Sequence, residues 1–317
     1  MGWLGWSAAV AIGLGLAIGG FAWWALSANS VASLDTVDSL FGRERGAKLV
    51  AMNRYGEHPA QKYELFVPEG APPAAGFPLV VFFHGGGWHS GDPHDYRFIA
   101  RALAERGYAT ALVGYRLVPA GRFPNMLLDS AAGARAALNA AARHRVDTRR
   151  MGLMGHSAGA YNAVMLALDP HWLDDAGAPR GVVKGAVVLA GPADFYPFDK
   201  KSSINAMGRW PRPEQTQPVN YARADAPPLL LVHGTDDTVV RPRNAIALAR
   251  AMTARGAPMQ ATLIEGMGHN GLVITLARPF DRDRRVGDAV FGFLARVLPP
   301  EVERPTTASL SVQAARP

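Results

Sequence analysis

The sequence contains no cysteine. This absence excludes disulfide bonds, thiolate metal sites, a cysteine nucleophile and a lipid-modified cysteine. The chain also lacks an internal repeat, and its basic residues are not gathered into a stripe interleaved with aromatic ones, although the formal net charge is +7. Dispersed arginines give a basic surface rather than a nucleic-acid groove, so we expect no nucleic-acid partner.

Charged residues are missing from the segment Trp3 to Leu26, which carries tryptophans toward both ends. About 20 apolar residues in a helix span a bilayer core of roughly 30 Å, and an interfacial aromatic belt places tryptophan at its two edges. A cleaved signal peptide is the alternative, but the run is long for one and no Lys or Arg precedes it. We therefore predict that residues 1–30 form a transmembrane anchor. The catalytic domain is placed provisionally outside the cytoplasm, because the weak charge bias of residues 31–48 leaves the membrane side open.

Extended and helical patterns alternate after this segment. With 317 residues, 49% of them hydrophobic, the chain is long enough for one large α/β domain with a substantial core. Two extended runs separated by a turn predict that the sheet begins with an antiparallel pair of strands, which we call its antiparallel entry. The βα units that follow predict a mostly parallel twisted sheet with helices on both faces. The expected strands are 48–53, 61–67, 79–83, 108–115, 150–154, 182–190, 229–232 and 259–264, and the expected helices are 96–106, 125–143, 158–168 and 241–255.

Domain boundaries follow from the same patterns. The α/β domain is expected at residues 31–300. Within it, the stretch 191–227 is too long for a plain connector, so it is interpreted as a short lid-like insertion that shapes a substrate site. Residues 301–317 are rich in Pro, Ala, Thr and Ser and are predicted to form a loose tail.

A serine stands at the centre of the pentapeptide Gly-His-Ser-Ala-Gly at 155–159, directly after an apolar run. A sharp strand-to-helix turn strains its central residue, so the residues two before and two after it must be very small. The pattern therefore predicts a nucleophile elbow with Ser157 above the carboxyl edge of the sheet. The helix behind it has unpaired N–H groups in its first turn, where an oxyanion could bind. His156, inside the turn, is interpreted as a packed spacer rather than a base.

Three glycines follow the buried run 79–83, in the sequence His-Gly-Gly-Gly-Trp at 84–88. Glycines after a buried strand let the backbone approach a ligand with its N–H groups turned inward. We expect Gly86, Gly87 and Ala158 to donate these groups to an oxyanion. His84 and Trp88 are expected to brace the loop. Tyr161 is assigned to the same pocket or loop support.

Two acids and a histidine follow later strands. Asp236 and Asp237 come after 229–232, and His269 comes after 259–264. A serine hydroxyl is a weak nucleophile, so it needs an imidazole to take its proton and a carboxylate to orient that imidazole. The order Ser, Asp, His at successive strand ends supplies both. Neighbouring residues in a turn point in different directions, so only one of the two acids is expected to face the imidazole.

As a set, these segments resemble the α/β-hydrolase fold, and within it the esterases with an HGGG-type loop, near the hormone-sensitive-lipase-like and the feruloyl or acetyl esterase groups. The resemblance covers residues 48–298. It rests on His84-Gly85-Gly86-Gly87-Trp88, on Tyr115-Arg116-Leu117 followed by Phe123-Pro124, on Gly155-His156-Ser157-Ala158-Gly159, on His233-Gly234-Thr235-Asp236-Asp237 and on Gly268-His269. The long cap of the hormone-sensitive-lipase-like members does not precede the first strands here.

The resemblance implies hydrolysis of small to moderate acyl esters through an acyl-serine intermediate, without a cofactor. Ser157 would attack, His269 would carry the proton, and Asp237 would orient His269. In related hydrolases the acid follows His-Gly and two variable residues. The same spacing here places Asp237 at the position of the acid, with Val239 packed beneath it. The implied partner is a small-molecule ester, and the oligomeric state is left open.

Two other functions remain open. The same constellation serves amide hydrolases such as formamidases and peptidases. A non-catalytic interaction protein on a hydrolase fold is the third possibility, although such proteins usually lack one member of the triad. A metal site from His89, Asp92 and His94 does not match a known ligand spacing, so no metal is expected.

Overall fold

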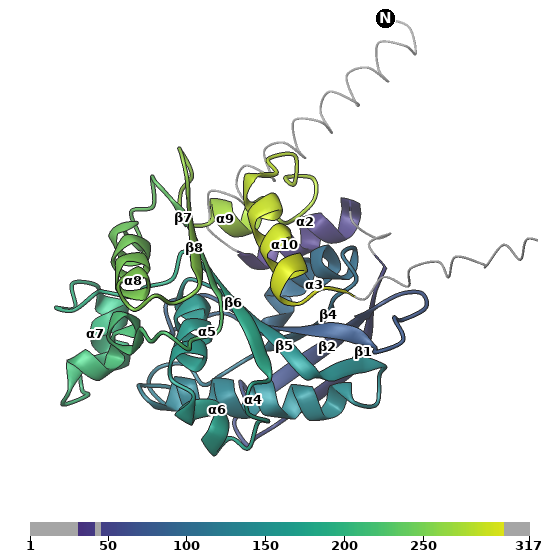
Figure 1. The fold of residues 1–317 in the computed structure, drawn as a ribbon, viewed down its shortest axis with the longest axis horizontal. Coiled ribbons are helices and arrows are strands. Elements are labelled where there is room, and N and C mark those ends of the chain that lie inside the picture. Colours follow the sequence, from purple (N-terminus) through teal and green to yellow (C-terminus); the bar gives the residue numbers. More distant parts are fainter. Residues whose placement is uncertain (1–30, 42–45, 301–317) are drawn as a thin grey trace, which may run out of the picture.

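The computed structural model describes residues 31–41 and 46–300. Its centre is an eight-stranded sheet in the order β1-β2-β4-β3-β5-β6-β7-β8 (Figure 1). Strand β2 is antiparallel to both of its neighbours, and all other neighbouring strands are parallel. The predicted antiparallel entry and mostly parallel sheet are therefore confirmed. The strands are β1 (Ala47–Arg54), β2 (Lys62–Pro68), β3 (Phe77–Phe83), β4 (Ala109–Val113), β5 (Val146–His156), β6 (Val183–Leu189), β7 (Leu229–Gly234) and β8 (Met259–Ile264).

Helices lie on both faces of this sheet (Figure 1). The α-helices are α2 (Val31–Phe41), α3 (Arg97–Ala104), α4 (Asn125–Ala141), α5 (Ala158–Leu168), α6 (His171–Asp175), α7 (Lys201–Met207), α8 (Arg243–Ala254), α9 (Gly271–Ile274) and α10 (Arg285–Val297). Three short 3-10 helices are η1 (Pro93–Tyr96), η2 (Pro213–Thr216) and η3 (Pro218–Tyr221).

The central strand β3 shows why the sheet has two cores. All seven of its residues are buried. Because successive side chains in a strand point to opposite faces, Leu79, Val81 and Phe83 join the core under α4, α5 and α8, while Val80 and Phe82 join the core under α3 and α10. A continuous apolar run is the pattern that burial on both faces requires.

Several elements differ from the sequence-based expectation. Strand β5 begins at Val146, four residues before its predicted start, because Asp147 pairs with Arg149 and Arg150 and lets a polar stretch join the sheet. No helix was predicted at α2 or α10. Helix α10 is amphipathic and buries Val290 and Leu294 among other apolar side chains, so its pattern did carry a signal.

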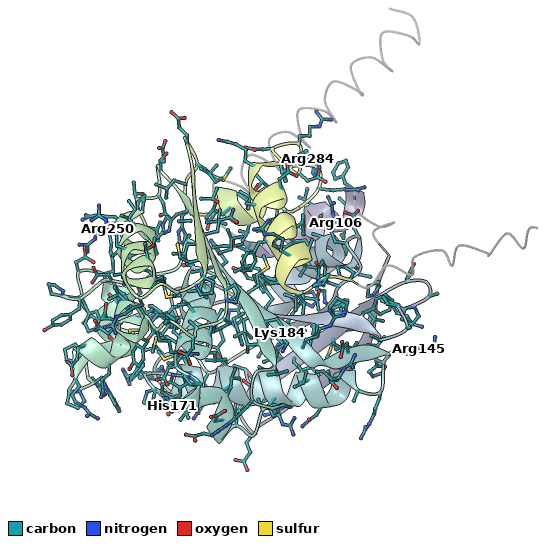
Figure 2. The ribbon with its side chains drawn as sticks, in the orientation of Figure 1. Arg106, Arg145, His171, Lys184, Arg250 and Arg284 are labelled. Atoms are coloured by element: carbon teal, nitrogen blue, oxygen red, sulfur yellow. The ribbon has the colours of Figure 1, made fainter. Side chains whose placement is uncertain are left out.

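Within the residues that the structure describes, no helix has the length and apolarity needed to cross a membrane. The predicted anchor at residues 1–30 and the predicted tail at residues 301–317 lie outside those residues. The basic side chains labelled in Figure 2, such as Arg145, Arg250 and Arg284, project from separate parts of the molecule, in keeping with the dispersed charge of the sequence.

Candidate active site

Ser157 lies between the last residue of β5 and the first residue of α5, with φ 56° and ψ −120°. Its backbone N–H donates to the Leu189 carbonyl on β6. A Cβ at Gly155 would collide with the backbone of Gly159, and a Cβ at Gly159 would collide with the Phe83 and His84 carbonyls. Both flanking positions therefore require glycine, which is the physical reason for the small residues around the serine.

A continuous hydrogen-bond chain joins Ser157, His269 and Asp237. The Oγ of Ser157 is 2.8 Å from Nε2 of His269, and Nδ1 of His269 is 2.7 Å from Oδ2 of Asp237. Asp237 follows β7 and His269 follows β8, so two carboxyl strand ends bring these groups to the elbow. The structure thus brings together all three residues that the sequence predicted as a triad, in the geometry that proton transfer from serine to imidazole requires.

The two adjacent acids have different surroundings. Both carboxylate oxygens of Asp237 are used, because Oδ1 accepts from the N–H groups of Val239 and Val240, at 2.9 Å each, while Oδ2 faces His269. Asp236 is exposed and accepts only a local hydrogen bond, from the Thr235 hydroxyl. The structure therefore turns Asp237, and not Asp236, toward the imidazole. The expected packing of Val239 beneath this acid is wrong, because its side chain is 56% exposed.

The electrostatics of Asp237 favour its ionised form. Burial opposes ionisation, but hydrogen bonds from His233 and His269, attraction to His269 and the N–H of Val240 outweigh it and hold the pKa of this carboxyl well below its usual range. His233 was not singled out in the sequence as a site residue. Its Nε2 donates to the Val240 carbonyl at 2.7 Å and lies 3.3 Å from Oδ2 of Asp237.

The glycine loop after β3 lies opposite the serine. Gly86, Gly87 and Ala158 line one cavity together with Ser157 and His269. Within the described residues, the backbone N–H groups of Gly86, Gly87 and Ala158 have no hydrogen-bond acceptor in the protein. Gly86 has φ +115°, and a Cβ there would collide with the Ser90 carbonyl. Unpaired N–H groups beside a serine are suited to donate hydrogen bonds to a developing oxyanion.

His84, which the sequence predicted as a support of this loop, contacts it through its ring. Its ring stacks on Tyr115 with centroids 4.4 Å apart, and its Nδ1 donates to the Gly85 carbonyl at 2.8 Å. The Tyr115 hydroxyl donates to the His84 carbonyl, and the Tyr96 hydroxyl accepts from the Gly85 N–H. Burial lowers the pKa of His84 to about 4, so this imidazole is neutral at pH 7 and acts as a fixed donor.

Trp88 lines the cavity, whereas Tyr161 lies fully buried behind it. The two rings meet edge to face with centroids 5.4 Å apart, so Tyr161 supports Trp88 and does not itself line the cavity. The indole N–H of Trp88 donates to Asn162 Oδ1 at 3.3 Å, and the Asn162 amide donates to Ser130 on α4. Asn162 was missed in the sequence, because a lone asparagine in an apolar helix gives no signal of its partner.

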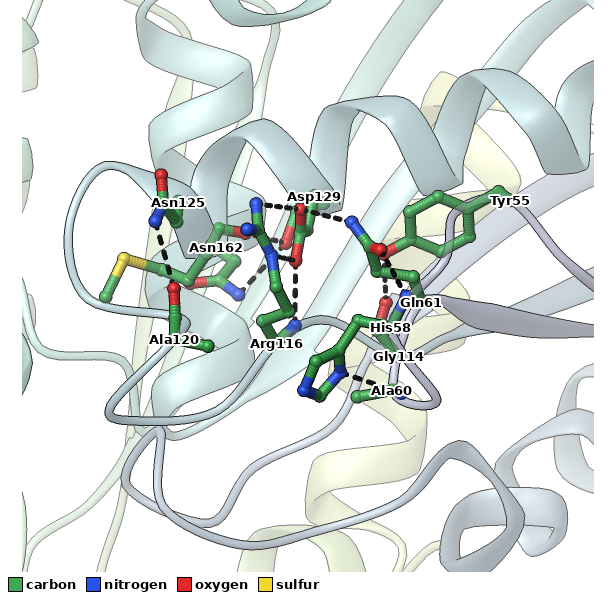
Figure 3. Close-up of polar contacts among 12 residues, drawn as sticks. Tyr55, His58, Ala60, Gln61, Gly114, Arg116, Ala120, Asn125, Asp129 and Asn162 are labelled. Carbon is green, nitrogen blue, oxygen red and sulfur yellow. Dashed lines mark hydrogen bonds and ion pairs between the residues drawn. The ribbon is translucent and has the colours of Figure 1, made fainter.

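A second buried network fixes the loop that follows β4 (Figure 3). Asp129 accepts two hydrogen bonds from the Arg116 guanidinium, one from the Arg116 backbone and one from Gln61. The same loop supports the glycine loop, because the N–H of Val118 donates to the Trp88 carbonyl at 2.8 Å. Arg116 was part of the motif that carried the family resemblance, and this structural contact gives it a role.

His156 does not contact the Ser157 hydroxyl through its ring, in keeping with the expectation that it is not the base. Its Nε2 donates instead to the backbone carbonyl of His269 at 3.2 Å. Burial, together with the nearby charge of His269, lowers the pKa of His156 to about 3. This contact gives the spacer residue a positioning role that the sequence did not reveal.

The cavity above these groups has a volume of about 660 Å³. Segment 191–227, the predicted lid-like insertion, contributes Pro192, Phe195, Asp199, Lys200, Ser202 and Ser203 to its wall. No cluster of three metal-ligating side chains occurs in residues 31–41 and 46–300. Asp92, one of the residues weighed as a ligand, is instead paired with Lys62.

The chain is similar to a known protein family and to several curated proteins. The BD-FAE family profile matches residues 64–252. Kynurenine formamidase from Danio rerio is 30% identical over 144 residues, covering 45% of this chain and 46% of that protein. A probable isoprenylcysteine alpha-carbonyl methylesterase from Arabidopsis thaliana is 25% identical over 247 residues, covering 69% of this chain and 50% of that protein. The chain thus spans about half the length of these curated relatives.

A solved structure, the thermostable esterase from Pseudomonas putida ECU1011, superposes with a TM-score of 0.67 at 21% identity, covering 88% of this chain and 89% of that one. Similarity at this level of identity shows the fold, which is the α/β-hydrolase fold that the sequence resembled. Because the family profile spans more than half of the chain, from the antiparallel strand β2 through the elbow to helix α8, the protein belongs to the BD-FAE family of α/β-hydrolases.

Proposed function

We propose that this protein is a serine carboxylic-ester hydrolase acting on small to moderate acyl esters. The observation that carries the proposal is the hydrogen-bond chain from Asp237 through His269 to Ser157, beside unpaired N–H groups at Gly86 and Ala158. The esterase names of several relatives support the same chemistry.

The reaction follows from these contacts. Ser157 Oγ attacks the ester carbonyl while His269 Nε2 takes its proton, and the N–H groups of Gly86, Gly87 and Ala158 receive the negative charge on the carbonyl oxygen. The tetrahedral intermediate collapses when His269 returns the proton to the departing alcohol, which leaves an acyl-serine. Water, deprotonated by His269, then attacks the acyl group, and collapse of the second tetrahedral intermediate releases the acid and restores the Ser157 hydroxyl.

The test is hydrolysis of an aryl ester series of increasing acyl length by the wild type and by Ser157→Ala. We expect turnover by the wild type, labelling of Ser157 by an organophosphate, and loss of both in the variant. Ser39→Ala, at a serine on α2 that makes only a local hydrogen bond, is the matched control and should retain activity. Folded wild-type protein that neither turns over esters nor reacts with the organophosphate would support a non-catalytic interaction protein instead.

An amide hydrolase is the second candidate, and the observation favouring it is the 30% identity to kynurenine formamidase over 144 residues. The two candidates share every residue of the mechanism and differ only in the leaving group. Comparing an aryl ester with the matched anilide separates them, because an amide hydrolase should retain a substantial part of its kcat/KM on the anilide whereas an esterase should lose most of it.

We further propose that the chain is attached to a membrane through Trp3 to Leu26. Support comes from the absence of charge in this run and from the tryptophans toward its ends. The expected result is that the full chain sediments with membranes and is released by detergent, while a form starting at Ser30 is soluble and active. Full-length protein in the soluble fraction, with the segment still attached by mass, would contradict the anchor.

A further inference from the structure

We propose that the mouth of the active-site cavity lies against a lipid bilayer and that the enzyme takes an amphiphilic ester directly from that surface. This inference rests on the esterase function and the membrane anchor proposed above. It adds to them the chemical class of the substrate, namely an ester whose alcohol or acyl part is embedded in the bilayer.

Helix α2 begins at the wall of the cavity. Val31, its first residue, lines the same cavity as Ser157 and His269. The apolar run that we expect to span the membrane ends at Leu26. A chain covers at most about 3.6 Å per residue, so the five steps from Leu26 to Val31 span no more than about 18 Å. The edge of the bilayer and the rim of the cavity are thus held within a short distance of one another.

Buried ion pairs and a hydrogen bond fix α2 to the domain. Asp38 on α2 is fully buried and, with Asp35, forms ion pairs with Arg101 on α3 at 2.5 Å each. The second oxygen of Asp38 accepts from the backbone N–H of Arg278 at 2.7 Å, and Leu34 is 4% exposed. Moving α2 away would leave buried charges unpaired, so the short tether ends on a rigid part of the cavity wall.

Exposed apolar side chains lie on, or directly after, residues that line the cavity. Val239 lines the cavity and is 56% exposed. Tyr196 and Ile204 are 53% and 47% exposed, and each directly follows a lining residue, Phe195 and Ser203 respectively. Exposed apolar and aromatic side chains next to a cavity are suited to the boundary between headgroups and acyl chains.

The charged side chains that line the cavity are also suited to contact with a bilayer. Lys200, Arg241 and Arg243 line the cavity with exposed side chains, against two acids, Asp95 and Asp199. Basic side chains beside apolar ones favour contact with anionic lipid headgroups. A bilayer ester held at this rim can enter the cavity without first crossing water, whereas a water-soluble ester gains nothing from it.

The experiment uses the full chain in phosphatidylcholine vesicles and two probes with the same acyl group, whose leaving groups share one fluorescent 7-hydroxycoumarin core. One probe is 4-methylumbelliferyl butyrate, which is water-soluble, and the other carries a heptadecyl chain in place of the methyl group, which keeps it in the bilayer. The first variant inserts 30 Gly/Ser residues between Ala28 and Asn29, which lengthens the tether by about 30 Å root mean square without touching the domain.

We expect the insertion to lower the ratio of bilayer-probe to soluble-probe kcat/KM on the order of 10-fold. The longer tether lowers the effective concentration of the cavity mouth at the bilayer surface. A form starting at Ser30 should lose more of that ratio, while hydrolysis of the soluble probe stays the same in all forms. Ile204→Asp, directly after the lining residue Ser203, should lower the same ratio, and Ile246→Asp, at an exposed isoleucine on α8 whose two chain neighbours do not line the cavity, is its matched control.

The outcomes separate the two proposals. Hydrolysis of the soluble probe with a ratio that neither the insertion nor Ile204→Asp changes would overturn the bilayer inference and leave the esterase function in place. Failure of every form to hydrolyse either probe would overturn the esterase function, and the inference would fall with it.

Discussion

The imidazole of His156 donates a hydrogen bond from Nε2 to the backbone carbonyl of His269 across 3.2 Å, and the two rings lie with centroids 4.9 Å apart. The direct neighbour of the candidate nucleophile thus holds the backbone of the residue proposed to take its proton. Because the acceptor is a carbonyl, Nε2 must carry a hydrogen, and the lowered pKa of His156, about 3, keeps the ring uncharged at neutral pH. His156 is a positioning residue in this arrangement.

Replacing this donor should slow the reaction without changing its pathway. We expect His156→Ala to lower kcat about 5-fold with little change in KM, because one neutral hydrogen bond contributes about 1 kcal/mol to holding His269 in place. His156→Gln, which keeps an N–H donor, should recover part of the loss. Steady-state kinetics on an aryl ester measures both, and equal losses in the two variants would count against the positioning role.

The buried histidines also make stability depend on pH. The pKa values of His84 and His156 fall from an ordinary 6.5 to about 4 and about 3 because both rings are buried. Below pH 6.5 the unfolded chain binds protons that the folded chain does not, so the free energy of unfolding falls as the pH falls, by up to about 1.4 kcal/mol per pH unit for each histidine. The pKa of Asp237 is also lowered, so its carboxylate adds to the free energy of unfolding near neutral pH. That stabilisation is lost only at more acidic pH.

Urea unfolding between pH 7 and pH 5 measures this effect. We expect stability to decrease more steeply as the pH falls through this window, and we expect His156→Asn to reduce the slope by an amount that approaches about one proton near pH 5, whatever its effect on stability at pH 7. A slope that is the same in the wild type and the variant would show that His156 is not the group responsible.

Much of the site could be predicted because its parts lie where local patterns end. Ser157, Asp237 and His269 each follow a strand of the sheet, and parallel strands bring their carboxyl ends to one edge of the sheet, so order along the chain was enough to expect them together. The choice of Asp237 over Asp236 came from the spacing found in related hydrolases, because the residue pattern alone did not distinguish the two acids.

What the sequence could not provide are pairings between distant polar side chains. The Trp88 indole meets Asn162 across 74 positions, and His156 meets the His269 carbonyl across 113. Each partner alone has an ordinary packing explanation, and no local periodicity encodes such a pair. Helix α2 was missed for a similar reason, since its buried Asp38 is paired with Arg101 and Arg278, which lie far along the chain.

The glycine loop gives a third test. Gly86→Val should lower kcat on the order of 100-fold or more, because φ is +115° there and a Cβ would collide with the Ser90 carbonyl, displacing the inward N–H groups. Gly292→Ala on α10, where the nearest atom to a new Cβ is a flexible Arg296 nitrogen at 3.8 Å, is the matched control and should stay fully active. Near wild-type turnover in Gly86→Val would place the oxyanion donors elsewhere.

The final prediction separates the two adjacent acids. Asp237→Asn should lower kcat on the order of 10,000-fold, because the amide removes the charge that stabilises the imidazolium and can present a donor where Nδ1 of His269 needs an acceptor. Its Oδ1 can still accept from Val239 and Val240, so the turn that holds it should persist. Asp236→Asn should lower kcat less than about 10-fold, since this side chain is exposed and accepts its hydrogen bond from the neighbouring Thr235.

Steady-state kinetics of the two variants, with circular dichroism to establish that both are folded, decides between them. The matched pair differs by one position in the chain and carries the same chemical change, so a general effect of removing a negative charge near the site would lower both alike. A loss concentrated in Asp237→Asn reports on the contact with His269 alone. A larger loss of kcat in Asp236→Asn than in Asp237→Asn would assign the orienting role to Asp236. That result would require a turn different from the one in which Asp237 accepts from Val239 and Val240.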